Sequence, residues 1–199
     1  VHLRQDRRHI QDRDIYLLRQ ELEVRMNFEM AAVDEIIAIA HQVQPHTVCL
    51  VPENRQEITT EGGLDVAGQV ERLRAVVDGM HARGIKVSMF IDPEEAQVDA
   101  SVATGADYVE LHTGAYANAQ DGDVEKELAR IRRCAAHIAT TSLRFHAGHG
   151  LTVENLEPIA RIPGLREVNI GHSIIARSLF IGLENAVTEI LEILRETGE

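Results

Sequence analysis

The sequence lacks the long apolar run that a membrane-spanning helix needs. Such a helix takes about 20 apolar residues, whereas runs such as 36–40 stop after five. The opening segment VHLRQDRRHI also lacks the apolar core of a signal peptide and the acid-poor pattern of a transit peptide. We therefore expect a soluble cytoplasmic protein with no membrane partner.

Cysteine and basic residues are also scarce. The chain has two cysteines, Cys49 and Cys134, and their spacing is not C-x-x-C, so we expect buried thiols of a reducing compartment in preference to a disulfide. Lys and Arg number 20 against 32 Asp and Glu, which gives a formal net charge of −12. This charge repels nucleic acid, so no nucleic-acid partner is expected.

Strand-like and helix-like segments alternate along the 199 residues, without low-complexity sequence or an interdomain linker. Short apolar runs predict strands at 1–3, 25–30, 47–52, 86–91, 108–112, 143–146 and 167–170. Helical spacing predicts helices at 13–23, 33–41, 70–83, 94–104, 125–139, 153–160, 174–180 and 183–196. The alternation indicates a parallel sheet covered by helices. No G-x-G-x-x-G follows the first strand, which favours a barrel over an open doubly wound sheet.

The predicted fold is therefore an α/β, (β/α)8 TIM barrel with extra helices, forming a single domain over 1–199. Seven strand candidates are present, and the first of them, Val1–Leu3, is cut short. A barrel of this type has eight strands. We expect this chain to lack the first βα unit, so that the natural protein continues upstream by roughly 40 residues.

Polar side chains cluster where the predicted strands end, which in a parallel barrel is the catalytic face. Two are acidic residues in apolar strands, Glu29 in NFEMA and Glu110 in VELHTG. A carboxylate in apolar surroundings is suited to act as a general base, although a salt bridge would also explain Glu29. Further polar residues at strand ends are Arg4, Glu53, Asp92, Thr113 and Asn169. The remaining ones are the histidines of four strand ends: His2, His112, His149 and His172. These side chains suit acid–base chemistry. A metal site is less favoured because no H-x-H or H-E-x-x-H spacing occurs.

Two glycine-bearing turns follow successive strands, in AGHGLT (147–152) and NIGHS (169–173). Small residues let backbone N–H groups approach a ligand, and the helix after each turn offers its positive N-terminus. In barrels, this pair of loops with a short extra helix typically binds phosphate. A further loop, RQEITTEGGLD (55–65), carries hydroxyls at Thr59 and Thr60 that could bind a polyol.

Taken in order, six segments resemble the pyridoxine 5′-phosphate synthase family from Val1 to the last helix. They are VHLRQDRRHI, NFEMA, LVPENRQEITTEGGLDVAGQ, VELHTGAYA, HAGHGLT and NIGHSII. The resemblance implies a (β/α)8 barrel with extra helices that assembles as a homo-oligomer, often an octamer. It also implies condensation of 1-deoxy-D-xylulose 5-phosphate with 3-amino-2-oxopropyl phosphate, releasing phosphate and water, with no metal and no redox cofactor.

The resemblance assigns roles to residues of this chain by motif. Its catalytic bases fall on His2 and Glu29, its proton donor on His149 and its transition-state stabiliser on Glu110. Contacts to the sugar phosphate fall on Arg4, His9 and Thr59. Contacts to the amino-ketone phosphate fall on Gly150, Gly171 and His172. Arg7 and Arg8 are instead expected to pair with Asp6, Asp12 or Asp14 on the surface.

One family feature has no counterpart here, namely an Asn-x-Asp-His segment and an arginine near the first strand. Two other functions stay open. The first is a barrel isomerase or aldolase that acts on one sugar phosphate. A Schiff-base aldolase needs a strand-end lysine, whereas Lys86 lies at a predicted strand start and Lys126 in a helix. A non-catalytic barrel that binds a phosphorylated ligand would need the glycine turns but not Glu29 or His149.

Overall fold

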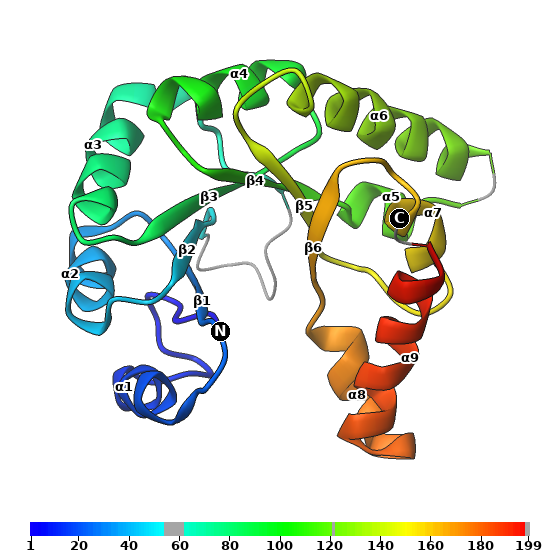
Figure 1. Cartoon of the computed structure of the whole chain (residues 1–199), viewed down its shortest axis with the longest axis horizontal. Coiled ribbons are helices and arrows are strands. Elements are labelled where there is room, and N and C mark those ends of the chain that lie inside the picture. The colour runs from blue at the N-terminus through cyan, green and yellow to red at the C-terminus, as the bar shows by residue number, and fades with distance from the viewer. Residues whose placement is uncertain (54–61, 121, 198–199) are drawn as a thin grey trace. The chain divides into compact units, whose positions relative to one another are not determined.

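The computed structural model describes residues 1–53, 62–120 and 122–197. Strands and helices alternate along the chain (Figure 1). Two compact units divide it, Val1–Val109 and Glu110–Glu199, and each is treated separately below. This division does not test whether the chain forms the expected single domain, which stays a prediction.

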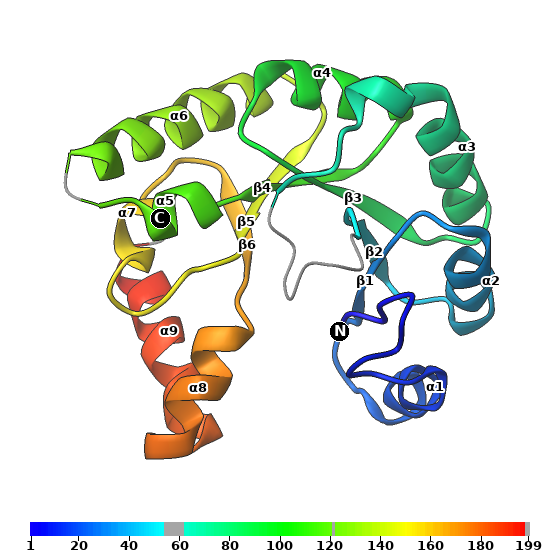
Figure 2. The same ribbon diagram turned by 180° about the vertical axis from the view of Figure 1, so that it is seen from behind.

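The first unit is a parallel sheet with helices along one side. Its strands are β1 (Asn27–Met30), β2 (Thr47–Leu50) and β3 (Lys86–Ile91), paired in that order and all parallel. Its helices are α1 (Asp12–Glu21), α2 (Asp34–Val43), the 3-10 turn η1 (Ala67–Gln69), α3 (Val70–His81) and α4 (Glu95–Thr104). In both views, α2 and α3 lie on the same side of these strands (Figures 1 and 2).

The second unit repeats the alternation. Strand β4 (Tyr108–His112) crosses the division, and β5 (Arg144–Gly148) and β6 (Leu165–Asn169) follow it in the sheet. Strands β5 and β6 are parallel, with a register shift between Phe145 and His146. The helices are α5 (Gly114–Asn118), α6 (Asp123–Ile138), α7 (Leu156–Ala160), α8 (His172–Ile181) and α9 (Leu183–Thr197).

Burial of apolar side chains explains where these elements form. The last five residues of β3 are buried, as expected of a strand covered on both faces. In α3, Leu73, Val77 and Met80 are buried and recur at helical spacing. Gly105 ends α4 with a φ of 82°, a left-handed conformation that costs glycine nothing. Cys49 and Cys134, both within the described residues, are buried thiols outside any disulfide, as predicted.

Most predicted elements are confirmed, and the parallel α/β class with them. Two predictions were wrong. The segment 1–3 forms a single parallel bridge, from His2 to Glu29, in place of a strand, because a three-residue edge segment can make few ladder bonds. The next helix after the strand 108–112 is predicted to begin at 125, whereas the short helix α5 begins directly after β4.

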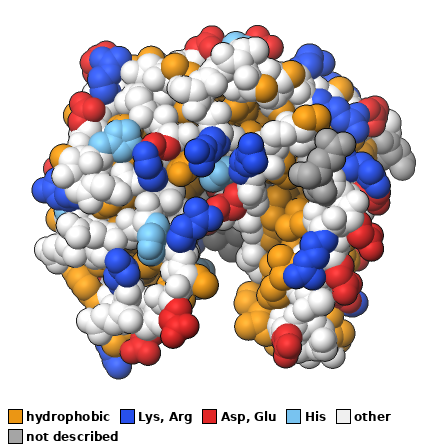
Figure 3. Space-filling view, in the orientation of Figure 1, with side chains coloured by type: hydrophobic (Ala, Val, Ile, Leu, Met, Phe, Trp, Pro, Cys, Tyr) orange, Lys and Arg blue, Asp and Glu red, His pale blue; other side chains and the backbone are white. Residues whose placement is uncertain are grey.

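The surface of α8 and α9 carries exposed apolar side chains (Figure 3). They are Ile175, Leu179, Phe180, Leu183, Val187 and Leu191. Exposed apolar patches of this kind often mark interaction surfaces. Among the residues that the structure describes, none of the helices is long and apolar enough to span a membrane.

Candidate active site

In the first unit, two carboxylates lie beside His2: the predicted Glu29 and a second one, Glu53. The parallel bridge to Glu29 fixes His2 beside the third residue of β1. The Nδ1 atom of His2 lies 3.6 Å from Glu29 Oε2. Its Nε2 lies 2.9 Å from Oε1 of Glu53, three residues beyond the end of β2. The imidazole thus lies between two carboxylates.

Glu29 differs from the expectation of wholly apolar surroundings. Burial alternates along β1, so that Phe28 and Met30 are buried while Glu29 lies on the other face. The Glu29 side chain is 33% exposed and faces His2. The structure therefore combines the two interpretations of this residue, because its partner is a basic side chain that can itself exchange protons.

Glu53 is a functional candidate that the sequence places at a strand end but to which it assigns no role in the site. Its second oxygen, Oε2, accepts a 2.8 Å hydrogen bond from the backbone N–H of Gln5. Burial raises the pKa of Glu53, but the hydrogen bonds from His2 and Gln5 and the positive charge of Arg4 outweigh it, so the pKa is lowered. Glu53 is thus held as an anion. Its place directly after the predicted apolar strand 47–52 is the sequence signal that points to it.

The predicted sugar-phosphate ligands are spread over different environments. Arg4 is buried, and its Nε lies 4.0 Å from Asp6 Oδ1. His9 is exposed, and Thr59 lies outside the described residues. The structure therefore buries Arg4, which follows His2 by two residues in the sequence, and leaves His9 on the surface.

Arg7 and Arg8 pair with surface acids, as predicted. The Nε of Arg7 donates to Asp12 Oδ1 at 2.6 Å, and its Nη2 pairs with Glu35. The Nε of Arg8 donates to Asp6 Oδ2 at 2.7 Å.

In the second unit, Glu110 is a buried carboxylate, with 4% of its surface exposed. It is the third residue of β4, and its Oε2 accepts a 2.8 Å hydrogen bond from Asn169 Nδ2 at the end of β6. A Cβ added at Gly148 would lie 2.1 Å from Glu110 Oε1. The absence of a side chain at this end of β5 therefore makes room for the carboxylate.

His149 follows β5 with an unusual backbone conformation. Its φ is 81° and that of Gly150 is 76°, a left-handed region that is costly for a residue with a side chain. The Thr113 hydroxyl holds the turn, lying 2.7 Å from the carbonyl oxygen of Gly148 and 2.6 Å from that of His149. The His112 ring packs edge-on against the His149 ring, with centroids 4.9 Å apart. The turn is thus fixed from β4.

The two predicted phosphate-binding turns are joined directly. Ser173, in the first turn of α8, donates its hydroxyl to the Leu151 carbonyl oxygen at 2.6 Å. Gly171 precedes α8 and His172 begins it, so the helix N-terminus lies beside the turn that carries Gly150. Backbone N–H groups of a helix start can bind an anion.

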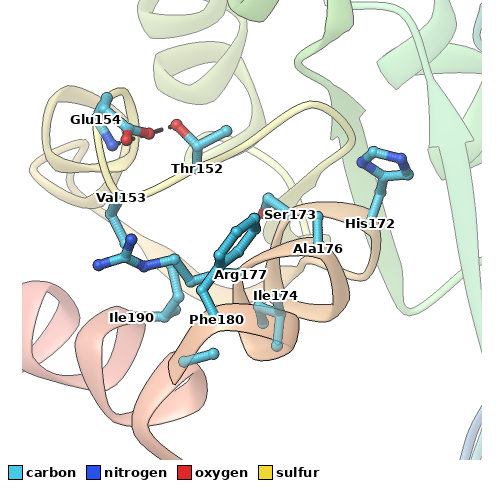
Figure 4. A pocket seen from close by; sticks show the side chains of 11 residues that line it. Thr152, Val153, Glu154, His172, Ser173, Ile174, Ala176, Arg177, Phe180 and Ile190 are labelled. Atoms are coloured by element: carbon cyan, nitrogen blue, oxygen red, sulfur yellow. Dashed lines mark hydrogen bonds between the residues drawn. The ribbon is translucent and has the colours of Figure 1, made fainter. Parts of the chain in front are cut away.

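Next to this helix start lies a pocket of about 380 Å³ between the 152–154 segment, α8 and α9 (Figure 4). His172 is at one end of its lining, while Phe180 and Ile190 make the opposite part apolar.

Two further groups bear on the alternative chemistries. Lys86 is the first residue of β3, where its ammonium lies 2.6 Å from Asp107 Oδ1. It is therefore at the amino end of its strand, the wrong end for a Schiff-base lysine in a barrel. Within the described ranges, no three His, Cys, Asp or Glu side chains are grouped as metal ligands.

Comparison with known proteins identifies relatives over almost the whole chain. Residues 1–196 match the family model for the pyridoxal phosphate biosynthesis protein PdxJ. The pyridoxine 5′-phosphate synthase of Synechococcus sp. strain CC9605 is 55% identical over 190 residues, which cover 96% of this chain and 76% of the relative. The pyridoxine 5′-phosphate synthase of Synechococcus sp. strain JA-2-3B'a(2-13) is 55% identical over 191 residues, which cover 96% of this chain and 80% of the relative.

Solved structures share the fold. KGPDC from Streptococcus mutans matches with a TM-score of 0.64 and 10% identity, over 96% of this chain and 81% of that one. A putative fructose-1,6-biphosphate aldolase from Coccidioides immitis matches with a TM-score of 0.59 and 16% identity, over 94% and 79%. These likenesses confirm the predicted α/β TIM-barrel fold class and nothing finer. The family match and the sequence relatives together show that the chain belongs to the PdxJ family of pyridoxal phosphate biosynthesis proteins.

Proposed function

We propose that this chain is a pyridoxine 5′-phosphate synthase of vitamin B6 biosynthesis that condenses 1-deoxy-D-xylulose 5-phosphate with 3-amino-2-oxopropyl phosphate. Phosphate and water are released as the ring closes. The relatives that bear this enzyme name support the activity. The observation that carries the chemistry is the histidine–carboxylate site of the first unit, where His2 Nδ1 lies 3.6 Å from Glu29 Oε2.

His2 and Glu29 are the proposed bases. Ring formation needs several proton shifts, and each needs a group that can accept a proton near neutral pH. The Nδ1 of His2 and the Oε2 of Glu29 are 3.6 Å apart, so both can act on the same region of a substrate. Their partial exposure, 22% and 33%, supports access by a substrate.

Glu110 and His149 have different proposed roles. Glu110 is buried and accepts an N–H donor from Asn169, an arrangement that supports a negative charge opposite a cationic, imine-like intermediate. His149 is proposed to donate a proton to a leaving oxygen. The Thr113 hydroxyl holds the left-handed backbone of His149, and this supports a fixed orientation of the imidazole.

Two phosphorylated substrates require two anion sites. For the sugar phosphate we propose Arg4, His9 and Thr59. For the amino-ketone phosphate we propose Gly150, Gly171 and His172. The hydrogen bond between Ser173 and Leu151 supports the second group, because it joins the turn after β5 to the N-terminus of α8.

The decisive test is to mix the two substrates with the chain and look for pyridoxine 5′-phosphate by fluorescence and mass spectrometry. Product together with an equal amount of inorganic phosphate would support the proposal. If no product forms while both ligands bind, the non-catalytic binding barrel is the better hypothesis. In that case, a Glu29→Gln, His149→Ala double variant should keep its ligand affinity.

The proposed assembly is a homo-oligomer, with an octamer as the expected form, and the proposed location is the cytoplasm. The exposed apolar side chains of α8 and α9 support association. The buried thiols of Cys49 and Cys134 support a reducing compartment. Light scattering coupled to size-exclusion chromatography would test the assembly.

A further inference from the structure

We propose that Glu53 is a positioning residue that holds the imidazole of His2 with its proton on Nε2, so that Nδ1 is the atom that accepts protons during the reaction. This inference rests on the proposed function, because it deepens the role given there to His2. It assigns a task to a buried carboxylate that lies next to the reacting groups.

Glu53 contacts two residues of one short segment, His2 and Gln5. One carboxylate oxygen lies 2.9 Å from His2 Nε2. The other accepts a hydrogen bond from the Gln5 backbone at 2.8 Å. The Glu53 side chain is 5% exposed, against 22% for His2. Both oxygens are thus engaged on one short segment, which fixes the position and the rotation of the ring.

The charge of Glu53 decides where the proton of His2 lies. Burial raises the pKa of Glu53, but its hydrogen bonds and the nearby Arg4 charge have the larger effect, and the pKa is lowered overall. Glu53 is therefore an anion, which can accept a hydrogen bond but cannot donate one. The hydrogen at a 2.9 Å contact must then come from Nε2. A neutral imidazole carries one ring proton, and Nδ1 therefore holds the lone pair.

Nδ1 is directed toward Glu29 without being hydrogen-bonded to it. Their separation is 3.6 Å, longer than the roughly 3.2 Å upper bound of an ordinary N–H···O hydrogen bond. When Nδ1 takes a proton from a substrate C–H or N–H bond, the electrons of that bond stay on the substrate. The imidazolium that forms lies between Glu29 and Glu53, whose negative charges offset its own.

Nuclear magnetic resonance tests the tautomer in the unaltered full chain. The chain is labelled with ¹⁵N-histidine, and the His2 signals are identified by their absence in His2→Gln. At a pH where the ring is neutral, we expect the Nε2–H tautomer. In Glu53→Gln the same signals should move toward a mixture of tautomers. An Nδ1–H tautomer in the unaltered chain would overturn the proposal.

Kinetics provide the second test. Loss of the hydrogen bond that orients a metal-ligating histidine typically costs about 10–100-fold in metal affinity or activity. Because Glu53 orients His2 in the same way, Glu53→Gln should lower kcat by about that factor, with KM for both substrates within about twofold. The matched control is Glu157→Gln, which removes an exposed carboxylate paired with Arg161 in α7, and should turn over normally.

The outcomes separate the two proposals. Normal turnover by Glu53→Gln in an otherwise active enzyme would overturn the role of Glu53 and leave the activity standing. If the unaltered chain makes no product, the proposed function fails, while the tautomer measurement still decides the position of the proton. Thermal unfolding of each variant, including the His2→Gln chain used to identify the signals, shows whether it is folded, and the tautomer itself is measured in the unaltered chain.

Discussion

Substituting Gly148 by alanine should damage both stability and activity, although it adds a single methyl group. The new Cβ would lie 2.1 Å from Glu110 Oε1 and 2.9 Å from the backbone oxygen of Asn169. Ordinary contact begins at 3.4 Å, so the carboxylate oxygen must move by about 1.3 Å. That movement competes with the 2.8 Å hydrogen bond from Asn169 to the buried carboxylate.

The expected magnitudes follow from these displacements. Overpacking a buried site costs about 1–3 kcal/mol, and weakening a hydrogen bond to a charged group adds about 1.5–3 kcal/mol. We expect Gly148→Ala to lower the free energy of unfolding by about 2.5–6 kcal/mol, measured by urea denaturation. A displacement near 1 Å in a reacting group can cost about 100-fold in rate, so kcat for pyridoxine 5′-phosphate formation should fall by about that factor.

The matched control is Gly122→Ala, at a glycine whose φ is −64° and whose added Cβ meets nothing within 4 Å. It should change stability by less than about 1 kcal/mol and leave kcat unchanged. If Gly148→Ala is as stable and as active as this control, Glu110 either is not held as described or does not act in the reaction.

Three other predictions concern single side chains. Thr113→Val removes the hydroxyl from the Gly148 and His149 carbonyls, and should cost about 1–3 kcal/mol in urea unfolding; a Thr113→Ser chain as unstable as the valine variant would contradict this. His149→Ala should lower kcat by about 10²–10⁴-fold with little change in phosphate affinity, and near-normal turnover would remove His149 from the mechanism. Burial, and then the Arg83 charge, lower the pKa of His41 from 6.5. The unfolded chain therefore binds more protons just below that pH, and stability should fall as the pH drops from about 7.5 to about 5.5. Urea unfolding at the two pH values should show a smaller loss for His41→Gln.

The sequence predicts elements best where both faces are covered. Strands β3 and β4 have the predicted bounds, 86–91 and 108–112, and in each of them every residue after the first is buried. Helix ends differ by up to three residues, since fraying and capping depend on neighbours. The short helix α5 escaped prediction because five residues cannot show a helical period.

Residue types at strand ends predicted His2, Glu29, Glu110 and His149 as candidates, but not what each one touches. The contact of His2 with Glu53 depends on the register that pairs Glu29 with Cys49 across β1 and β2. Such a register is fixed by the packing of whole strands, and it cannot be predicted from a local sequence pattern. The same holds for Thr113 and Asn169, whose partners lie on other strands.

Glu29 and Glu110 show how one residue type, at the same place in two strands, can be given different chemistry. Each is the third residue of its strand. Glu110 is buried and accepts an amide N–H from Asn169, a partner that does not exchange protons near neutral pH. Glu29 is partly exposed and faces the Nδ1 atom of His2, a partner that exchanges protons readily. The first arrangement suits a fixed charge and the second suits proton transfer. That difference arises from the neighbouring strand ends, and it gives the two acids their separate proposed roles.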